Sequence, residues 1–162
     1  RRGPAHRKPR RDPGSLDAEV SKISGSEDFV TVLLAQITGG NLALVNAGHP
    51  DPVLLRDDTV RMLPVTIRQP PLGLGAGDVD ITRVVLQAGD RLLLYTDGLT
   101  EARNPSTGEF LPLLPTARAA FTNVSLDTSL TALVHALRKW TSSSLNDDVA
   151  ILAAEVTDRR QN

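Results

Sequence analysis

The sequence predicts an α+β domain, in which a mostly antiparallel β-sheet meander carries packed helices. Three pairs of short apolar segments are each separated by a few turn residues, and connections that short join only antiparallel strands. A helical apolar stripe follows near the end of the chain. The length of 162 residues and the hydrophobic content of 40% suit a single domain with its own core.

The predicted strands follow one another as hairpins. Their turns contain Gly, Asn and Asp, residues that tolerate the backbone angles of tight turns. The first segment is mostly apolar and predicts a buried strand. The expected pairs are residues 29–37 with 42–46, 53–56 with 60–63, and 81–86 with 91–95.

Helices are expected at both ends of the chain. A short helix over residues 16–23 should end at Ser24 and Gly25, and a weaker helix is expected over 113–121. Asp127 can cap the principal helix, and Trp140 extends its apolar stripe. Residues at spacings i, i+3, i+4 and i+7 form that stripe: Leu130, Leu133, Val134 and Leu137. A last strand is expected over 149–155.

Charge divides the chain into a basic start and an acidic body. Residues 1–11 hold six of the 18 basic residues and no acidic one, which leaves 12 basic against 19 acidic residues, or −7. A basic segment can bind nucleic acid, but an acidic body offers the phosphate backbone no continuing surface. We therefore expect a disordered linker over 1–15, a domain over 16–157, a frayed tail over 158–162, and no nucleic-acid partner.

Composition excludes several classes of protein. The chain has no Cys, which removes disulfides, thiolate metal ligands and a cysteine nucleophile. We expect no signal peptide, and no apolar run approaches the roughly 20 residues that cross a bilayer. We expect a cytoplasmic protein without a membrane partner. Because the chain starts at Arg1 rather than Met, we also expect it to be part of a longer protein.

Two acidic segments lie at the ends of predicted strands. The segment 95–98, which contains Asp97 and Gly98, directly follows the apolar residues 91–94. The segment 146–148, which contains Asp147 and Asp148, directly precedes the apolar residues 149–154. If these strands are antiparallel neighbours, the carboxylates emerge at the same end of the sheet. Converging carboxylates repel each other, and a hard divalent cation relieves the repulsion. The pattern alone also permits the alternative that these residues only form turns.

Other candidate motifs are weaker. His49 lies in the segment 46–50 and could be a ligand, a general base or a residue that shapes the turn before Pro50. The glycine-rich segment 72–77 does not continue as G-x-G-x-x-G and no helix pattern follows it. His135 lies within the predicted principal helix and does not suggest a catalytic triad.

Six segments, in order, resemble the C-terminal part of a sporulation stage II E-type phosphatase domain. This is the bacterial branch of the metal-dependent PP2C-like (PPM) serine/threonine phosphatases. The segments are 29–31, 46–50, 71–73, 89–98, 100–104 and 147–150. The resemblance extends from about Phe29 to Val156 and implies a partial PP2C-like α/β/β/α sandwich.

The resemblance also implies a chemistry. Such enzymes use two Mn²⁺ or Mg²⁺ ions and a bridging water to hydrolyse phosphoserine or phosphothreonine. By this resemblance Asp97 and Asp147 are metal ligands, Gly98 and Asp148 support them, and no further catalytic residue is expected. The implied substrate is a phosphorylated regulatory protein, such as an anti-sigma-factor antagonist. A sensor domain is expected upstream in the parent chain.

The sequence departs from the family in one respect. The N-terminal half of the family carries G-D-x-Y-D and D-x-x-G-H-G motifs that supply further metal-binding aspartates, and neither motif occurs here. We therefore expect weak metal binding and little or no activity from this chain alone. The missing strands should leave a sheet edge unpaired and favour a homodimer. The alternative function is a non-catalytic regulatory or scaffolding module that has kept the fold.

Overall fold

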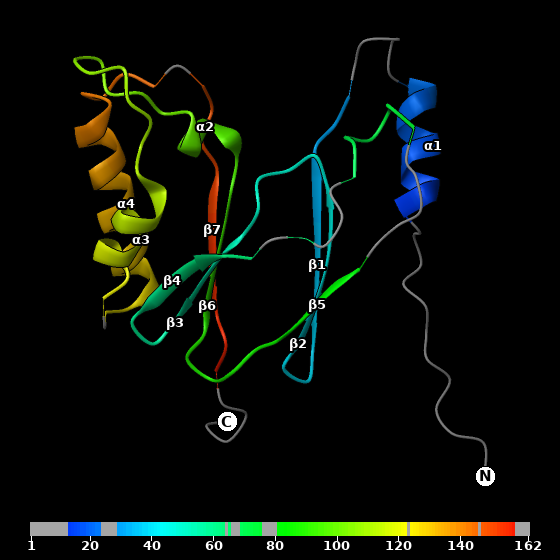
Figure 1. The fold of residues 1–162 in the computed structure, drawn as a ribbon, viewed down its shortest axis with the longest axis horizontal. Helices are drawn as coiled ribbons and strands as arrows, with labels where there is room; N and C mark the ends of the chain where they lie inside the picture. Colours follow the sequence, from blue (N-terminus) through cyan, green and yellow to red (C-terminus); the bar gives the residue numbers. More distant parts are fainter. Residues whose placement is uncertain are drawn as a thin grey trace.

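The computed structural model describes residues 13–23, 29–63, 65, 69–75, 81–122, 124–145 and 147–157. Two antiparallel sheets pack face to face between helices, which gives an α/β/β/α order of layers (Figure 1). Helix α1 (Pro13–Ile23) lies outside one sheet, and helices α3 and α4 lie outside the other. The predicted α+β class is confirmed.

The first sheet has three strands in the order β1-β2-β5: β1 (Val32–Thr38), β2 (Asn41–Ala47) and β5 (Thr82–Val85). The prediction that the first strand is buried is wrong. Five of the seven residues of β1 are exposed, and Ile37 retains 50% of its accessible surface. The reason is position, because β1 is an edge strand that pairs with β2 on one side.

The second sheet has four strands in the order β4-β3-β6-β7. Their bounds are β4 (Thr59–Met62), β3 (Val53–Arg56), β6 (Arg91–Tyr95) and β7 (Ile151–Glu155). Two of the predicted hairpins, β1–β2 and β3–β4, are confirmed. The last strand is confirmed too, although it begins two residues later than expected.

The third predicted hairpin is wrong, because β5 and β6 belong to different sheets. Leu86 follows β5 and is buried in the apolar cluster between the sheets. Its backbone N–H donates to Gly40 O in the first sheet, at 2.7 Å, whereas Gly89 N donates to Val156 O beside the second, at 2.8 Å. The segment between β5 and β6 therefore crosses from one sheet to the other instead of closing a hairpin.

The helices follow their predicted positions with two corrections. Helix α1 begins at Pro13, three residues before the predicted start, and Ser24 and Gly25 lie outside the described residues, as do 1–12 and 158–162. Helix α4 (Leu126–Trp140) is capped by Ser125 rather than by Asp127. Ser125 has extended backbone angles and its Oγ accepts from Thr128 N at 3.2 Å, whereas Asp127 lies inside the first turn.

Two apolar clusters hold the layers together. One lies between the four-stranded sheet and the helices α3 (Leu113–Ala120) and α4. It contains Val53, Leu93, Leu99, Ala117 and Leu133, each fully buried. The other lies between the sheets and contains Leu42, Leu44, Leu54, Leu63, Leu86 and Leu92. Because both faces of the four-stranded sheet are covered, its central strands β3 and β6 are the most buried, as their continuous apolar sequences predict.

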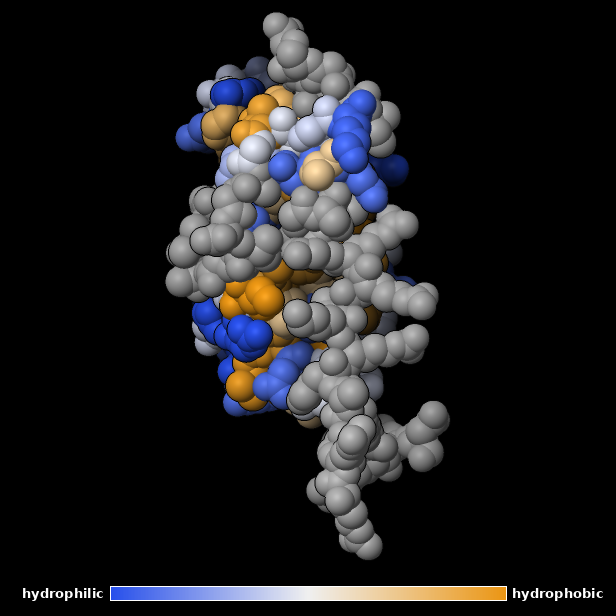
Figure 2. All heavy atoms as spheres, turned by 90° about the vertical axis from the view of Figure 1, so that its right-hand side faces the viewer, coloured by the Kyte–Doolittle hydropathy of each residue, from blue (hydrophilic) through white to orange (hydrophobic). Residues whose placement is uncertain are grey.

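The three-stranded sheet is less completely covered. Figure 2 views the molecule from the side of α1 and shows hydrophobic residues reaching the surface. Among the exposed apolar side chains of this sheet are Leu34, Ile37 and Val85, at 38%, 50% and 69% exposure. On the other sheet, Leu152 of the edge strand β7 is 62% exposed. None of the helices in the described part of the chain combines the length and apolar character of a membrane span.

Candidate metal centre

The two acidic segments meet at one end of the four-stranded sheet. Strands β6 and β7 are antiparallel neighbours, and their register ends with Tyr95 opposite Ile151. One step further, Thr96 N donates to Ala150 O at 3.1 Å. The residues that follow β6 therefore lie beside the residues that precede β7. A shared site required that these two strands be antiparallel neighbours, and they are.

Gly98 lies where these segments touch. It is buried in the short helix α2 (Asp97–Thr100). A Cβ atom at Gly98 would overlap Asp148 O, and it would lie 3.1 Å from Asp148 C and 3.2 Å from Val149 Cγ2. Only a residue without a side chain allows this approach of the two backbones.

Each of the two predicted ligands has a carboxylate oriented by the next residue. Asp97 Oδ1 accepts from Gly98 N at 3.0 Å, and Asp147 Oδ1 accepts from Asp148 N at 2.8 Å. Asp97, Asp147 and Asp148 are all exposed. Their carboxylates are thus accessible from solvent, while the backbone that carries them belongs to contacting segments.

A buried polar network supports the same end of β6. Tyr95 is 3% exposed and its hydroxyl donates to Asp51 O at 2.8 Å. Asn46 Nδ2 donates to His49 O at 2.8 Å and to Asp51 Oδ1 at 3.2 Å, and Asn46 Oδ1 accepts from His49 N at 2.8 Å. These bonds close the turn over 46–51 and fasten it to β6, two residues before Asp97.

His49 takes part in this turn through its backbone. Its ring Nδ1 lies 3.3 Å from Thr31 Oγ1. Of the alternatives open from the sequence, the geometry matches a residue that shapes the turn before Pro50.

Comparison with known families identifies the fold. The family model of Stage II sporulation protein E (SpoIIE) matches residues 9–157. The chain belongs to the SpoIIE family.

Solved structures agree with this assignment to the SpoIIE family. The RsbU and RsbW domains of Rv1364c from Mycobacterium tuberculosis superpose with a TM-score of 0.73 at 28% identity, over 88% of this chain and 40% of that one. The phosphatase domain of SpoIIE from Bacillus subtilis gives a TM-score of 0.69 at 15% identity, over 99% of this chain and 80% of that one. The catalytic domain of the serine/threonine phosphatase PstP, in complex with two manganese ions, gives 0.64 at 22% identity, over 90% of this chain and 66% of that one.

The SpoIIE-family chain described here spans less than half of the Rv1364c chain that it matches. The two more distant structures share its fold, and together they establish a PP2C-like architecture for this member of the SpoIIE family.

The candidate donors fit a hard divalent cation in kind but not in number. Carboxylate oxygens are the ligands that Mg²⁺ and Mn²⁺ prefer. Asp97 and Asp147 supply two of them from contacting segments. However, no group of three or more His, Cys, Asp or Glu side chains among the described residues is arranged to hold a metal ion.

Sequence reasoning missed part of the candidate site. It included Tyr95 and Thr96 in the segment 95–98 without giving either a role, and it did not single out Asp51. Thr96 contributes a backbone hydrogen bond to Ala150, Tyr95 donates its hydroxyl hydrogen to Asp51 O, and the Asp51 side chain accepts from Asn46. Tyr95 carried a signal, because a tyrosine in a buried apolar strand needs a partner for its hydroxyl. Asp51 carried a weaker one, since it lies between two prolines directly after the 46–50 motif.

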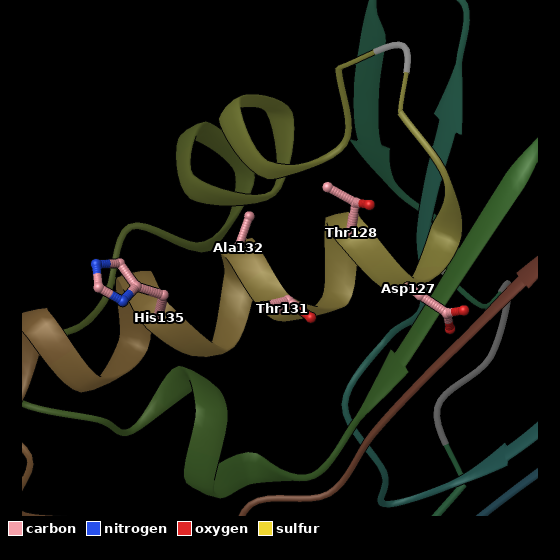
Figure 3. Close-up of a pocket in the computed structure, with 5 residues that line it drawn as sticks. All are labelled: Asp127, Thr128, Thr131, Ala132 and His135. Carbon is pink, nitrogen blue, oxygen red and sulfur yellow. The ribbon is translucent and has the colours of Figure 1, made fainter.

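A second concave surface lies elsewhere on this SpoIIE-family fold. Asp127, Thr128, Thr131, Ala132 and His135 line a depression along α4 (Figure 3). The figure shows His135 and Asp127 at opposite ends of that stretch of helix, so they do not form an acid–base pair.

Proposed function

We propose that this chain carries part of the active site of a metal-dependent protein serine/threonine phosphatase. In this proposal Asp97 and Asp147 bind Mn²⁺ or Mg²⁺, and Gly98 and Asp148 support them. The observation that carries the proposal is the pairing of β6 with β7, because it places residues 96–98 against residues 148–150. Membership of the SpoIIE family supports the reaction class.

The two aspartates would act as hard, negatively charged oxygen donors. The N–H groups of Gly98 and Asp148 fix one oxygen of each carboxylate, so less rotational freedom is lost when a cation binds. A divalent ion held there would lower the pKa of a bound water and neutralise charge on phosphoryl oxygens. Neither step needs a nucleophilic side chain, in agreement with a chain that has no Cys.

We expect the chain alone to bind the metal weakly. Two carboxylates leave most positions of an octahedral ion to water or to ligands from elsewhere. Little or no phosphatase activity should follow, because the reaction class depends on a fully held metal pair. The expected substrate of the complete enzyme is a phosphorylated regulatory protein, such as an anti-sigma-factor antagonist, under the control of a sensor domain in the parent chain.

Calorimetric titration with Mn²⁺ tests the metal site. Wild-type chain should bind weakly, and Asp97→Asn and Asp147→Asn should each abolish the binding. Asp58→Asn is the matched control, because Asp58 is an exposed acid in the turn between β3 and β4. Equal binding by wild type and both site variants would refute the assignment of these ligands. Robust hydrolysis of a phosphopeptide by the 162-residue chain would refute its expected inactivity.

A regulatory or scaffolding module is the second candidate. The observation that favours it is the small donor set, since no group of three or more His, Cys, Asp or Glu side chains among the described residues is placed to hold a metal ion. This candidate predicts no Mn²⁺-dependent heat for wild type, whereas the phosphatase proposal predicts weak binding that depends on both aspartates.

A further inference from the structure

We infer that Thr96 is a positioning residue that fixes Asp97 and Asp147 relative to each other. The inference rests on the proposed metal site. It concerns a side chain that binds neither metal nor substrate in that proposal and acts through the backbone of the opposite segment.

The Thr96 hydroxyl makes two hydrogen bonds across the site. Its Oγ1 donates to Asp148 O at 3.2 Å and accepts from Ala150 N at 3.0 Å. A hydroxyl has one donor and two acceptor lone pairs, so both bonds are satisfied at the same time. With the backbone bond from Thr96 N to Ala150 O at 3.1 Å, three hydrogen bonds join residue 96 to residues 148–150.

These bonds lie where the regular sheet ends. The ladder between β6 and β7 stops at Tyr95 and Ile151, and Asp148 has no place in it. Beyond the last strand pair, the hydrogen bonds of the Thr96 side chain therefore hold the two segments together in place of backbone pairing. Because threonine is β-branched, its χ1 angle is restricted, and the direction of the hydroxyl is correspondingly well defined.

Both proposed ligands are one residue away from these bonds. Asp148 accepts from Thr96 through its carbonyl and orients Asp147 through its N–H, which donates to Asp147 Oδ1 at 2.8 Å. Asp97 follows Thr96 directly. The same Asp148 carbonyl contacts the position of Gly98, whose N–H orients Asp97. Loss of the hydroxyl should thus free Asp148 and, through it, the Asp147 carboxylate.

A purely structural role for Thr96 makes a different prediction. If the hydroxyl only fastens the end of the sheet, its removal should lower stability and leave the carboxylates and the metal affinity unchanged. Thr96→Val removes the hydroxyl at nearly constant volume, and Thr96→Ser retains it. Thr141→Val is the matched control, because the buried Thr141 hydroxyl donates to Leu137 O at 3.1 Å at the end of α4.

Two readouts separate positioning from stability. Three-bond NMR couplings report the χ1 rotamers of Asp97 and Asp147 in the metal-free chain, and calorimetry reports Mn²⁺ affinity. In Thr96→Val we expect rotamer averaging at Asp147 and an affinity loss of about tenfold, as for other partners that orient metal ligands. Thr96→Ser should stay near wild type in both readouts, and Thr141→Val should change the unfolding temperature alone.

Three outcomes would overturn the inference. The first is wild-type couplings and affinity in Thr96→Val despite a lower unfolding temperature. The second is loss of affinity that Thr96→Ser fails to rescue. The third needs no variant and applies if Thr96→Val does not fold: rapid hydrogen exchange of the Ala150 amide in wild type would show that its bond to Thr96 is absent. If wild type bound no Mn²⁺, the proposed function would fail, and the couplings alone would decide the role of Thr96.

Discussion

The Arg56 guanidinium donates two hydrogen bonds to the Asp90 carboxylate, from Nε at 2.8 Å and from Nη2 at 2.6 Å. Asp90 lies on the crossing from β5 to β6, and its side chain is 1% exposed. Arg56 Nη2 also donates to Val85 O at the end of β5, at 3.0 Å. The pair therefore joins β3 of the four-stranded sheet to the segment that follows β5 of the three-stranded sheet. It fixes the crossing between the two sheets, where the sequence predicted a single meander.

Stability should depend on pH through this pair. The hydrogen bonds from Arg56 hold the pKa of Asp90 below its ordinary value, although burial of the carboxylate acts in the opposite direction. A lowered folded-state pKa means that the stabilisation is complete above the unfolded pKa of about 3.9 and is lost as the pH falls through the folded value. Urea unfolding between neutral and strongly acidic pH measures this loss.

The Asp90→Asn variant isolates the contribution of Asp90. It should be less stable at neutral pH by roughly 2 kcal/mol, because a charge-assisted bidentate bond is replaced by a neutral one. It should also lose less stability than wild type on acidification. Exposed Asp58→Asn should keep the wild-type pH profile. Parallel pH profiles for Asp90→Asn and wild type would contradict the assignment.

Gly98→Ala should damage the proposed metal centre and the fold together. The added methyl group would meet the Asp148 backbone and Val149 Cγ2, and the backbone cannot move aside as a flexible side chain can. We expect a loss of about 2 kcal/mol in unfolding free energy, the usual cost of overpacking. Urea denaturation measures it, and amide shifts at Asp148 and Ala150 should change with it. An unperturbed Asp148 amide would show that the two segments are not in contact.

Ser125→Ala should cost more stability than a change at Asp127. The Ser125 hydroxyl satisfies an otherwise unpaired N–H at the start of α4, a contribution of about 1 kcal/mol. Asp127→Asn removes only the interaction of a charge with the helix dipole, which contributes about 0.3–1 kcal/mol. Thermal unfolding of the two variants distinguishes these values, and the reverse order would support Asp127 as the cap.

The sequence predicted most elements because short-range rules decide them. The β1–β2 and β3–β4 hairpins depend on local turns, and the stripe of α4 depends on spacing within one helix. The pairing of β5 could not be predicted in the same way. The sheet to which β5 belongs depends on long-range contacts. Leu86 is buried between the sheets, and the bond from Arg56 to Asp90 joins residues 34 positions apart. Exposure of Ile37 likewise depends on which strands lie beside β1, not on its own apolar sequence.

The candidate site, like the fold, could be predicted from the sequence only in part. Asp97 and Asp147 are candidates because acidic residues at strand ends are visible in the sequence and because the resemblance implies them as ligands. The neighbouring strands bring their segments together. The contributions of Thr96 and Asp51 were not visible. Each depends on a contact with a backbone or side-chain group whose position only the folded chain defines.

The partly exposed sheets should promote self-association through the edge strands β1 and β7. Ile37 and Leu152 expose 50% and 62% of their surface on these strands. Exposed apolar edges favour pairing with another chain, and a charge on such an edge opposes it. Light scattering should show a dimer for wild type and a monomer for Ile37→Lys combined with Leu152→Lys. Leu74→Lys, at an equally exposed loop position, is the control. Monomeric wild type throughout the micromolar range would refute this prediction.

Residue-resolved Mn²⁺ titration tests the shared carboxylate site most directly. A paramagnetic ion broadens the amide signals of nearby residues in ¹H–¹⁵N spectra. The proposed site predicts that the amides of Gly98 and Asp148 broaden first and together, while those beside the exposed acids Asp58 and Asp127 remain sharp. Broadening that begins at Asp58 or Asp127, or that affects Gly98 without Asp148, would contradict a cation held jointly by Asp97 and Asp147.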